Sequence, residues 1–413
     1  MMAALIEAGG DNPLACGIQG GPAMNRLESI DLMRGLVMVL MALDHTRDFF
    51  SNAMFDPTDL SQTSIVLFIT RWITHICAPT FVFLAGTSAH LSALRRNRTH
   101  HQLAWYLFTR GLLLIVLELT LVRFTWTFNW NYHFVLMQVI WVLGWSMVVL
   151  AGLVFLPRWA IALFALVAIA GHNLFNAFQP GDLGAWSWLW TILHVPGSIE
   201  YLPGYSFFVA YPLIPWIGVM AAGYCIGPVF LQAERSRRTT FLLLGFVCVA
   251  AFLLLRLNNI YGDPRPWLPQ KDSLFTLFAI LNCEKYPPSL LYLLITLGLM
   301  FFLLTLFEWN RLHRFGRPLI TFGRVPLFFY IIHFFLIHSA ALAVTWFRGL
   351  PTDWLFHGFG RFPFPVLRGA ESGYDLVTVY GVWIALLVIL YPICYAYAQF
   401  KQRHREIRWL SYL

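Results

Sequence analysis

Residues 288–307 read PSLLYLLITLGLMFFLLTLF, a run of 20 residues without a charged side chain. An α-helix rises about 1.5 Å per residue, so about 20 apolar residues cross the hydrocarbon core of a bilayer. The stretch therefore predicts a membrane-spanning helix.

The composition of the whole chain agrees with this prediction. Of 413 residues, 59% are hydrophobic and only 12% are charged, with a mean hydropathy of +0.65. Soluble domains average about 25% charged residues, so a soluble fold is excluded. Six scattered cysteines without a CxxC pair do not support a disulfide scaffold. The net charge of +8 comes from basic residues at the ends of apolar segments, which indicates membrane insertion rather than nucleic-acid binding.

Nine further segments have a comparable length and apolar character. The sequence therefore predicts an all-α, polytopic membrane helical bundle of about ten transmembrane helices. The expected spans are 30–50, 64–93, 103–123, 133–156, 158–176, 206–230, 240–257, 288–307, 319–345 and 377–400. Segments 184–202 and 274–282 are too short or too broken to span, and we expect interfacial or re-entrant pieces there.

Lysine and arginine counts in alternate loops predict the orientation of the bundle. The loops on the side of the N-terminus hold 15 of these residues, and the opposite loops hold nine. Because basic loops stay in the cytoplasm, both termini should be cytoplasmic. Residues 1–28 lack the pattern of a cleaved signal peptide, and we expect residues 1–25 to form a disordered N-terminal tail ahead of one transmembrane domain, 26–413.

Ionisable side chains inside apolar spans are costly, so each is a candidate functional residue. The ionisable residues in the expected spans are Arg34, Asp44, His45, Arg71, His75, Arg110, Glu118, Arg324, His333 and His338. Arg34 and His45 are eleven residues apart, which places them on one helix face and roughly 16 Å apart in depth. Asp31, three residues before Arg34, is close enough to pair with it.

A second pair should lie near His45. Arg71 and His75 have i, i+4 spacing, and the next helix brings them to the depth of Asp44 and His45. A histidine beside a carboxylate can accept and release protons near neutral pH, so Asp44 could orient His45 as a general base.

Simpler explanations exist for several of these residues. A single membrane histidine such as His338 is often a hydrogen-bonded packing residue, and Arg110 and Arg324 could extend toward the membrane surface. His333 and His338 do not share a helix face, and no zinc, phosphate-loop or dinucleotide motif occurs. We therefore expect no metal and no ATP-driven transport.

Several strings resemble a known family when they are taken in order. The strings are RLESIDLMRGL (26–36), LDH (43–45), FVFLAGTS (81–88), EKYPPS (284–289), FGRVPLFFY (322–330) and WLSYL (409–413). Together they resemble the bacterial family related to the catalytic domain of heparan-alpha-glucosaminide N-acetyltransferase. The resemblance covers nearly all of residues 26–413.

The first helix also resembles the Arg/His motif of the broader membrane acyltransferases that O-acetylate surface sugars. The resemblance implies a multi-pass enzyme of the bacterial inner membrane that takes acetyl-CoA from the cytoplasm as co-substrate. The acyl group would pass to a glycan or amino-sugar acceptor outside, with His45 as catalytic base or transient acyl carrier. Arg34 and Arg324 would meet the CoA phosphates.

The remaining expectations complete this assignment. Arg71 and His75 would polarise the thioester carbonyl or the developing oxyanion. Asp31, Lys285 and His333 would join Arg34 and Arg324 in binding substrate or CoA. We expect membrane lipid as a partner and no nucleic acid, and a homodimer is compatible with the sequence.

One departure leaves the acceptor atom open. In the lysosomal enzyme the catalytic histidine lies in the loop after the first helix, where this chain has Asp56. His45 instead matches the sugar O-acyltransferases, so oxygen and nitrogen both stay open as acceptor atoms. The rival hypothesis is a transporter or flippase for a lipid-linked or anionic solute, in which buried arginine and histidine would bind cargo or relay protons.

Overall fold

A computed structural model describes residues 27–309, 316–357, 373–404, 406 and 407. The expected tail at 1–25 and the WLSYL stretch at 409–413 lie outside these residues.

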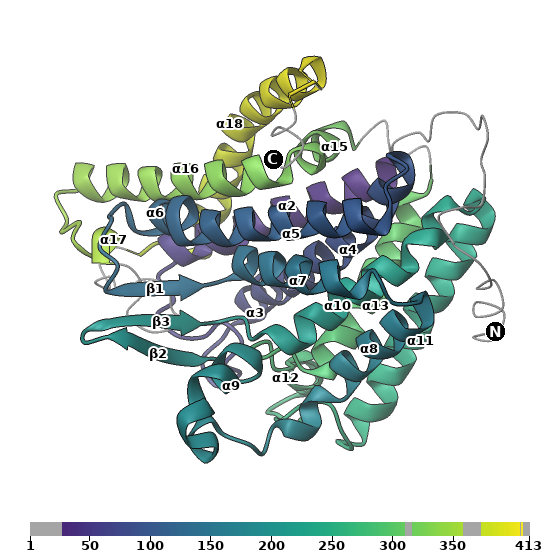
Figure 1. The fold of residues 1–413 in the computed structure, drawn as a ribbon. Coiled ribbons are helices and arrows are strands. Elements are labelled where there is room, and N and C mark those ends of the chain that lie inside the picture. Colours follow the sequence, from purple (N-terminus) through teal and green to yellow (C-terminus); the bar gives the residue numbers. More distant parts are fainter. Residues whose placement is uncertain (1–26, 310–315, 358–372, 405, 408–413) are drawn as a thin grey trace.

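Helices dominate the described part of the chain (Figure 1). The α-helices are α2 (Glu28–Phe50), α3 (Ile65–Trp72), α4 (Cys77–Arg95), α5 (His100–Leu117), α6 (Arg123–Thr127), α7 (Val139–Leu153), α8 (Arg158–Ala170), α9 (Ser187–Leu193), α10 (Leu213–Ile226), α11 (Glu234–Leu257), α12 (Ser273–Leu281), α13 (Leu290–Phe307), α15 (Arg317–Arg324), α16 (Pro326–Phe347), α17 (Trp354–His357) and α18 (Leu376–Arg403). Short helical turns are η1 (Ile73–Ile76), η2 (Glu118–Val122), η3 (His172–Phe175), η4 (Pro180–Trp186) and η5 (Gly227–Leu231).

Length and composition confirm a membrane protein and identify six described helices able to cross a bilayer. They are Ile65–Arg95, Leu213–Leu231, Glu234–Leu257, Leu290–Phe307, Pro326–Phe347 and Leu376–Arg403. Helices α7 and α8 are apolar but shorter, and α2 carries several charged side chains along its 23 residues. The expected total of about ten spans therefore remains a prediction.

A small β-sheet is the main departure from the all-α expectation. Its strands β1 (Phe134–Met137), β3 (Tyr205–Val209) and β2 (Gly197–Leu202) lie in that order, with β1 parallel and β2 antiparallel to β3. Exposure alternates residue by residue along β2, as in a strand with one covered face. Gly204 supplies the positive φ of the turn between β2 and β3.

The sheet changes two of the expected segments. Segment 184–202 forms α9 and strand β2, and the expected span 133–156 divides into β1 and α7. Segment 274–282 is the short helix α12, which begins where the Asp272 carboxylate accepts a hydrogen bond from the backbone N–H of Phe275.

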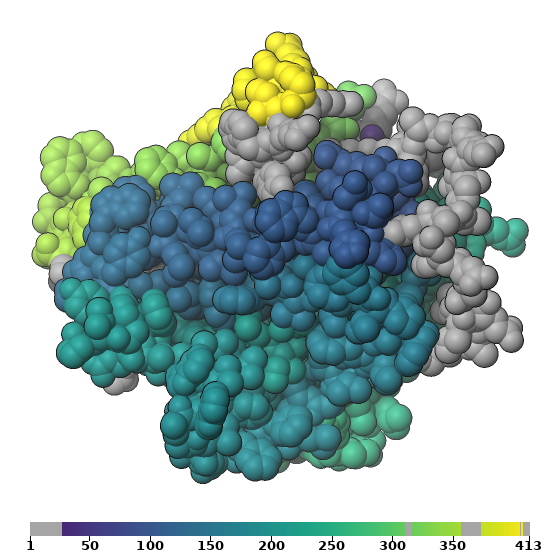
Figure 2. Space-filling model, in the orientation of Figure 1, coloured from purple at the N-terminus to yellow at the C-terminus, as the bar shows by residue number. Residues whose placement is uncertain are grey.

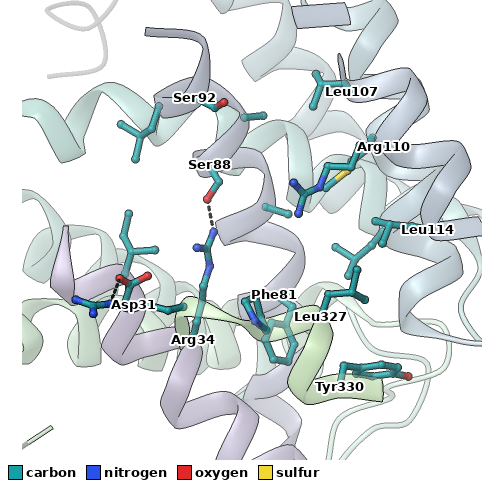
Figure 3. Close-up of a pocket in the computed structure, with 18 of the residues that line it drawn as sticks. Asp31, Arg34, Phe81, Ser88, Ser92, Leu107, Arg110, Leu114, Leu327 and Tyr330 are labelled. Carbon is teal, nitrogen blue, oxygen red and sulfur yellow. Dashed lines mark hydrogen bonds and ion pairs between the residues drawn. The ribbon is translucent and has the colours of Figure 1, made fainter. Parts of the chain in front are cut away.

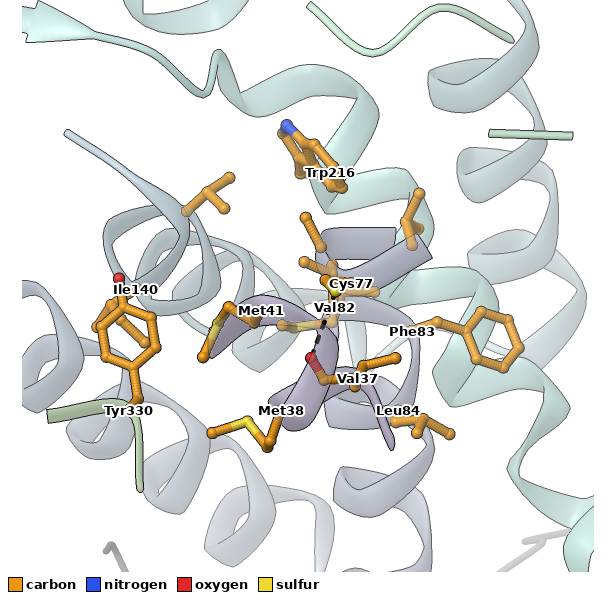
Figure 4. Packing of buried hydrophobic residues seen from close by; sticks show 14 of the residues in the cluster. Val37, Met38, Met41, Cys77, Val82, Phe83, Leu84, Ile140, Trp216 and Tyr330 are labelled. Atoms are coloured by element: carbon orange, nitrogen blue, oxygen red, sulfur yellow. Dashed lines mark hydrogen bonds between the residues drawn. The ribbon is translucent and has the colours of Figure 1, made fainter. Parts of the chain in front are cut away.

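Helix α2 lies at the centre of the bundle and contacts α4, α13, α15, α16 and α18. Its apolar face joins side chains from α4, α7 and α10 in one continuous core (Figure 4). The Cys77 thiol on α4 donates to the carbonyl of Val37 on α2, at 3.3 Å. Much of the core is therefore built around the helix that carries Arg34 and His45.

Two helices keep apolar faces exposed. Helix α18 stands out from the rest of the molecule (Figures 1 and 2), and Val377 and Val388 on it are 79% and 68% exposed. Helix α11 likewise exposes Leu254 and Phe246. Apolar side chains of this kind suit contact with lipid rather than water.

Candidate functional site

Two cavities lie at successive depths along α2. The larger, which we call the basic cavity, has a volume of about 440 Å³, and the smaller, the His45 cavity, about 70 Å³. The charged residues of the basic cavity are Asp31, Arg34, Arg95, Arg96, Arg110, Arg324 and Lys401. The charged or ionisable residues of the His45 cavity are Asp44, His45, Arg47, Asp48, Arg71 and Lys285.

His45 lies near the C-terminal end of α2 with one ring nitrogen against a carboxylate. Its Nδ1 is 3.3 Å from Oδ2 of Asp48, one helical turn further along. Since an ionised carboxylate only accepts hydrogen bonds, Nδ1–H is the donor and Nε2 is left to take a proton. The ring packs on Phe334 and Trp126, with centroid distances of 4.2 and 5.3 Å. The sequence placed Asp44 in this orienting position, and the structure has Asp48.

Asp44 belongs to an ion-pair network instead. Nη1 of Arg71 lies 2.8 and 2.6 Å from its two carboxylate oxygens, and Nη2 of Arg47 lies 3.1 Å from Oδ1. The same Nη2 of Arg47 is 2.7 Å from Asp48. These contacts compensate the cost of burying two carboxylates.

His75 is near this network but does not line either cavity. It is buried on η1, with its carbonyl accepting from the Tyr292 hydroxyl at 2.7 Å. The i, i+4 argument assumed a continuous α-helix after Arg71, but the chain tightens at Ile73–Ile76 into a 3₁₀ turn, which changes the angular spacing of side chains.

His333 and Lys285 both lie away from the basic cavity, and only Lys285 lines the His45 cavity. His333 is fully buried on α16, with its ring centroid 5.5 Å from that of His45 and its Nδ1 3.0 Å from the Phe329 carbonyl. Lys285, between α12 and α13, lines the His45 cavity. Neither lines the basic cavity.

The basic cavity brings together the other three residues expected to bind CoA. Arg34 extends from α2 to α4, where Nη2 donates to the Ser88 hydroxyl and to the Leu84 carbonyl (Figure 3). Nε of Arg324 lies 3.9 Å from the Asp31 carboxylate. Figure 3 shows Arg110 on the helix that faces Arg34 across the cavity.

The two cavities share part of their lining. Phe81, Val139 and Tyr330 line both. Figure 3 shows Phe81 and Tyr330 at the end of the basic cavity opposite Ser92. These three side chains therefore lie where the basic cavity and the His45 cavity adjoin.

Sequence reasoning missed Arg47, Asp48 and Tyr330. The i, i+3 spacing of His45 and Asp48 was a usable signal, whereas the position of Tyr330 depends on how α16 packs. Arg110, considered as a residue that could extend to the membrane surface, lines the basic cavity.

Asp56 occupies the position of the lysosomal enzyme's histidine but lines neither cavity. Its Oδ1 accepts hydrogen bonds from the backbone N–H and hydroxyl of Thr58, at 2.9 and 2.8 Å. These bonds form a local turn, in which aspartate is a common residue. In the described parts of the chain, no group of three or more His, Cys, Asp or Glu side chains could hold a metal ion.

Comparison with protein families gives one match. The family model described as heparan-alpha-glucosaminide N-acetyltransferase, catalytic, matches residues 26–254, which is more than half of the chain. The chain belongs to this acetyltransferase family. The match confirms the resemblance and indicates a transferase of the membrane. It contains Arg34, His45 and Arg71, whereas Lys285 and Arg324 follow it in the chain. No match was found among curated proteins.

Proposed function

We propose that this member of the heparan-alpha-glucosaminide N-acetyltransferase catalytic family is a membrane acetyltransferase. It moves acetyl from cytoplasmic acetyl-CoA to a sugar hydroxyl or amine at the outer face of a bacterial inner membrane. The observation that carries the proposal is the shared lining of the basic cavity and the His45 cavity. A donor can bind in the first and react in the second.

The basic cavity suits the polyanionic part of CoA. Arginine and lysine side chains outnumber its single carboxylate, and guanidinium groups bind phosphate through paired N–H donors. Leu107, Leu114 and Leu327 supply apolar wall for the pantetheine arm. The arm would pass Phe81 and Tyr330 with the thioester at its tip.

His45 would act as general base in the small cavity. Nε2 takes the proton of the acceptor hydroxyl or amine as that atom attacks the acetyl carbon. The C–S bond then breaks, and the protonated ring returns a proton to the CoA thiolate. Asp48 holds the ring through Nδ1 and balances its charge during the transfer. An acyl-histidine intermediate uses the same nitrogen as nucleophile.

The test is release of CoA from acetyl-CoA by the purified protein in detergent. His45→Ala should lower the rate by about 10²–10⁴-fold, the usual contribution of a general base. Arg34→Ala should mainly raise the KM for acetyl-CoA. Arg235→Ala, which changes an exposed arginine that lines neither cavity, should match wild type.

A second readout separates the proposal from its rival. Acetyl-CoA should raise the thermal midpoint of wild type, because a ligand that binds only the folded state stabilises it. Absence of both CoA release and this stabilisation would reject the enzyme and leave the transporter hypothesis to be tested.

A further inference from the structure

Lys285 is a buried cation without an ion-pair partner among the described residues. Its side chain lines the His45 cavity, and the residue is only 8% exposed. In the described ranges no carboxylate lies within 4 Å of its ammonium group. Its nearest aromatic contact is the Tyr286 ring, 5.2 Å away.

Arg47 also lines this cavity and has a donor group that is not used. Its Nη2 contacts Asp44 and Asp48, but Nη1 is buried and has no hydrogen-bond partner among the described residues. The residue is 6% exposed. A buried N–H group without a partner loses its hydration and gains nothing in return, so such groups are rare in proteins and need an explanation.

The charges around the cavity leave one cation in excess. Asp44 and Asp48 face the three cations Arg47, Arg71 and Lys285. Both carboxylates already pair with guanidinium groups, and Nη1 of Arg71 contacts both oxygens of Asp44. An excess positive charge away from water is costly unless negative charge arises next to it.

The size of the cavity indicates where that negative charge arises. A space of about 70 Å³ holds only about five water molecules. An acetyl carbon within reach of His45 therefore lies in the same small space as Arg47 and Lys285. During attack on a thioester, the negative charge develops on the oxygen bound to that carbon.

We propose that Nη1 of Arg47 and Nζ of Lys285 are the donors that stabilise the oxyanion of acetyl transfer. This inference rests on the proposed acetyltransferase function. As the acceptor atom bonds to the acetyl carbon, the carbonyl π pair moves onto oxygen and the acceptor proton moves to His45. The oxyanion then re-forms the carbonyl, the C–S bond breaks and the thiolate takes the proton from His45. Both residues are catalytic residues, because they contact a reacting atom.

The experiment compares Lys285→Gln with Lys271→Gln, a control on an exposed lysine that lines neither cavity. CoA release is measured with water, glucose and glucuronic acid as acceptors. We expect kcat to fall about 10²–10³-fold with all three acceptors in Lys285→Gln, with an unchanged KM for acetyl-CoA. Lys285→Arg should recover part of the rate because it keeps a cationic donor.

A second variant addresses Arg47. Arg47→Lys keeps a charge that can pair with Asp48 but removes the guanidinium fork and with it Nη1. We expect a fall in kcat with the thermal midpoint nearly retained. If Lys285→Gln lowers the thermal midpoint, Lys285→Met, which keeps the length of the side chain and removes the charge, replaces it.

Three outcomes would overturn the inference alone. The first is a wild-type kcat in Lys285→Gln. The second is a loss of rate confined to glucuronic acid, which would indicate that Lys285 belongs to an anion subsite for the acceptor. The third is a raised KM for acetyl-CoA at constant kcat, which would indicate that Lys285 binds the donor. Failure of the proposed function looks different, because wild type itself would then release no CoA, and the inference would fall with it.

Discussion

At the scale of single residues, the environment of each carboxylate separates two aspartates that look alike in the sequence. Asp44 is adjacent to His45 in the chain, but successive residues on a helix point about 100° apart. Asp48 lies one turn away on the same side and reaches Nδ1 of His45. Asp44 points to Arg71 from the next helix.

The two aspartates should therefore respond differently to substitution by asparagine. Asp48→Asn should lower kcat, on the order of 10²-fold, because the ring loses the acceptor that orients it. Asp44→Asn should mainly destabilise the fold, by about 3–5 kcal/mol, because it leaves Arg71 buried with reduced compensation. Thermal midpoints and CoA release, measured on both variants, check the assignment. A more stable Asp44→Asn with lost activity would contradict it.

A histidine pair beyond the C-terminal end of α8 should make stability depend on pH. His172 and His194 are each 1% exposed, with ring centroids 5.6 Å apart. Burial lowers the pKa of His172 to about 3, with a smaller contribution from His194, and burial lowers the pKa of His194 to about 4. In the unfolded chain both titrate near 6.5.

Because the unfolded chain binds protons first, the folded state has its full stability above pH 6.5 and loses it as the pH falls. At pH 5 each of the two rings should lower the free energy of unfolding by about 1–2 kcal/mol. The check is the thermal midpoint of wild type and His172→Phe at pH 7.5 and 5. The thermal midpoint of the variant should decrease less between pH 7.5 and 5 than that of wild type. Equal decreases would rule out His172 as a source of the pH dependence.

At the scale of elements, glycines let helix backbones touch. A Cβ at Gly86 on α4 would overlap the Met220 carbonyl oxygen of α10, and one at Gly223 on α10 would overlap the Phe83 carbonyl oxygen of α4. Small residues commonly permit such close crossings between membrane helices. The same holds where Gly35 and Gly323 bring α2 and α15 together, beside the pair Asp31 and Arg324.

Substitution of these glycines should separate the helices. Gly86→Ala and Gly223→Ala should each cost about 1–3 kcal/mol, because the backbones must move apart to admit a methyl group. Gly152→Ala on α7 is the matched control, since nothing lies within 4 Å of its Cβ position. It should be neutral or stabilising by about 0.5–1 kcal/mol, as expected for alanine in a helix. Equal thermal midpoints for all three variants would contradict the close crossing.

The local geometry of strand β2 and of the turn η1 explains two expectations that differ from the structure. The alternating pattern of 197–202 is that of a strand, but it follows an apolar, tryptophan-rich stretch, which suggested a single interfacial piece. The 3₁₀ turn at η1 removed His75 from the cavity that Arg71 lines. Both changes are local departures from regular helix geometry, which spacing arguments assume.

At the scale of the whole molecule, charge is separated along the bundle. The cations of the basic cavity come from the start of α2, from α5 and from the ends of α4, α15 and α18. The β-sheet lies at the opposite end, beside α6 and α17 (Figure 1). The predicted orientation would place the basic end toward the cytoplasm and the sheet toward the outside.

Cysteine labelling tests that orientation. Arg235→Cys, in the basic first turn of α11, should react with a membrane-impermeant maleimide only after the membrane is opened. Gly181→Cys, in the opposite loop where a Cβ meets no atom within 4 Å, should react in intact cells. Labelling of the unsubstituted protein is the control for reaction at the native cysteines. The reverse labelling pattern would invert the topology and place the basic cavity outside.

Much of the site could be predicted because it lies on one helix. Helical periodicity alone places Arg34 and His45 on one face at two depths, and the structure assigns each to its own cavity. Residues contributed by distant segments were harder to place. Lys285 and His333 were expected with CoA, but Lys285 lines the His45 cavity and His333 packs near the His45 ring without lining either cavity. Loop and helix packing decides these positions.

The sequence by itself determined that the protein is a helical membrane protein, that it carries ionisable groups within its spans, and that it belongs to an acetyltransferase family. Apolar length, charge spacing and motif order are properties of the chain, independent of how its helices pack. Only the tertiary structure decided that Asp48 rather than Asp44 faces His45, and that Phe81, Val139 and Tyr330 join two cavities. Those relations depend on helix rotation and close packing between segments far apart in the sequence, because side chains from several helices must converge on one small space.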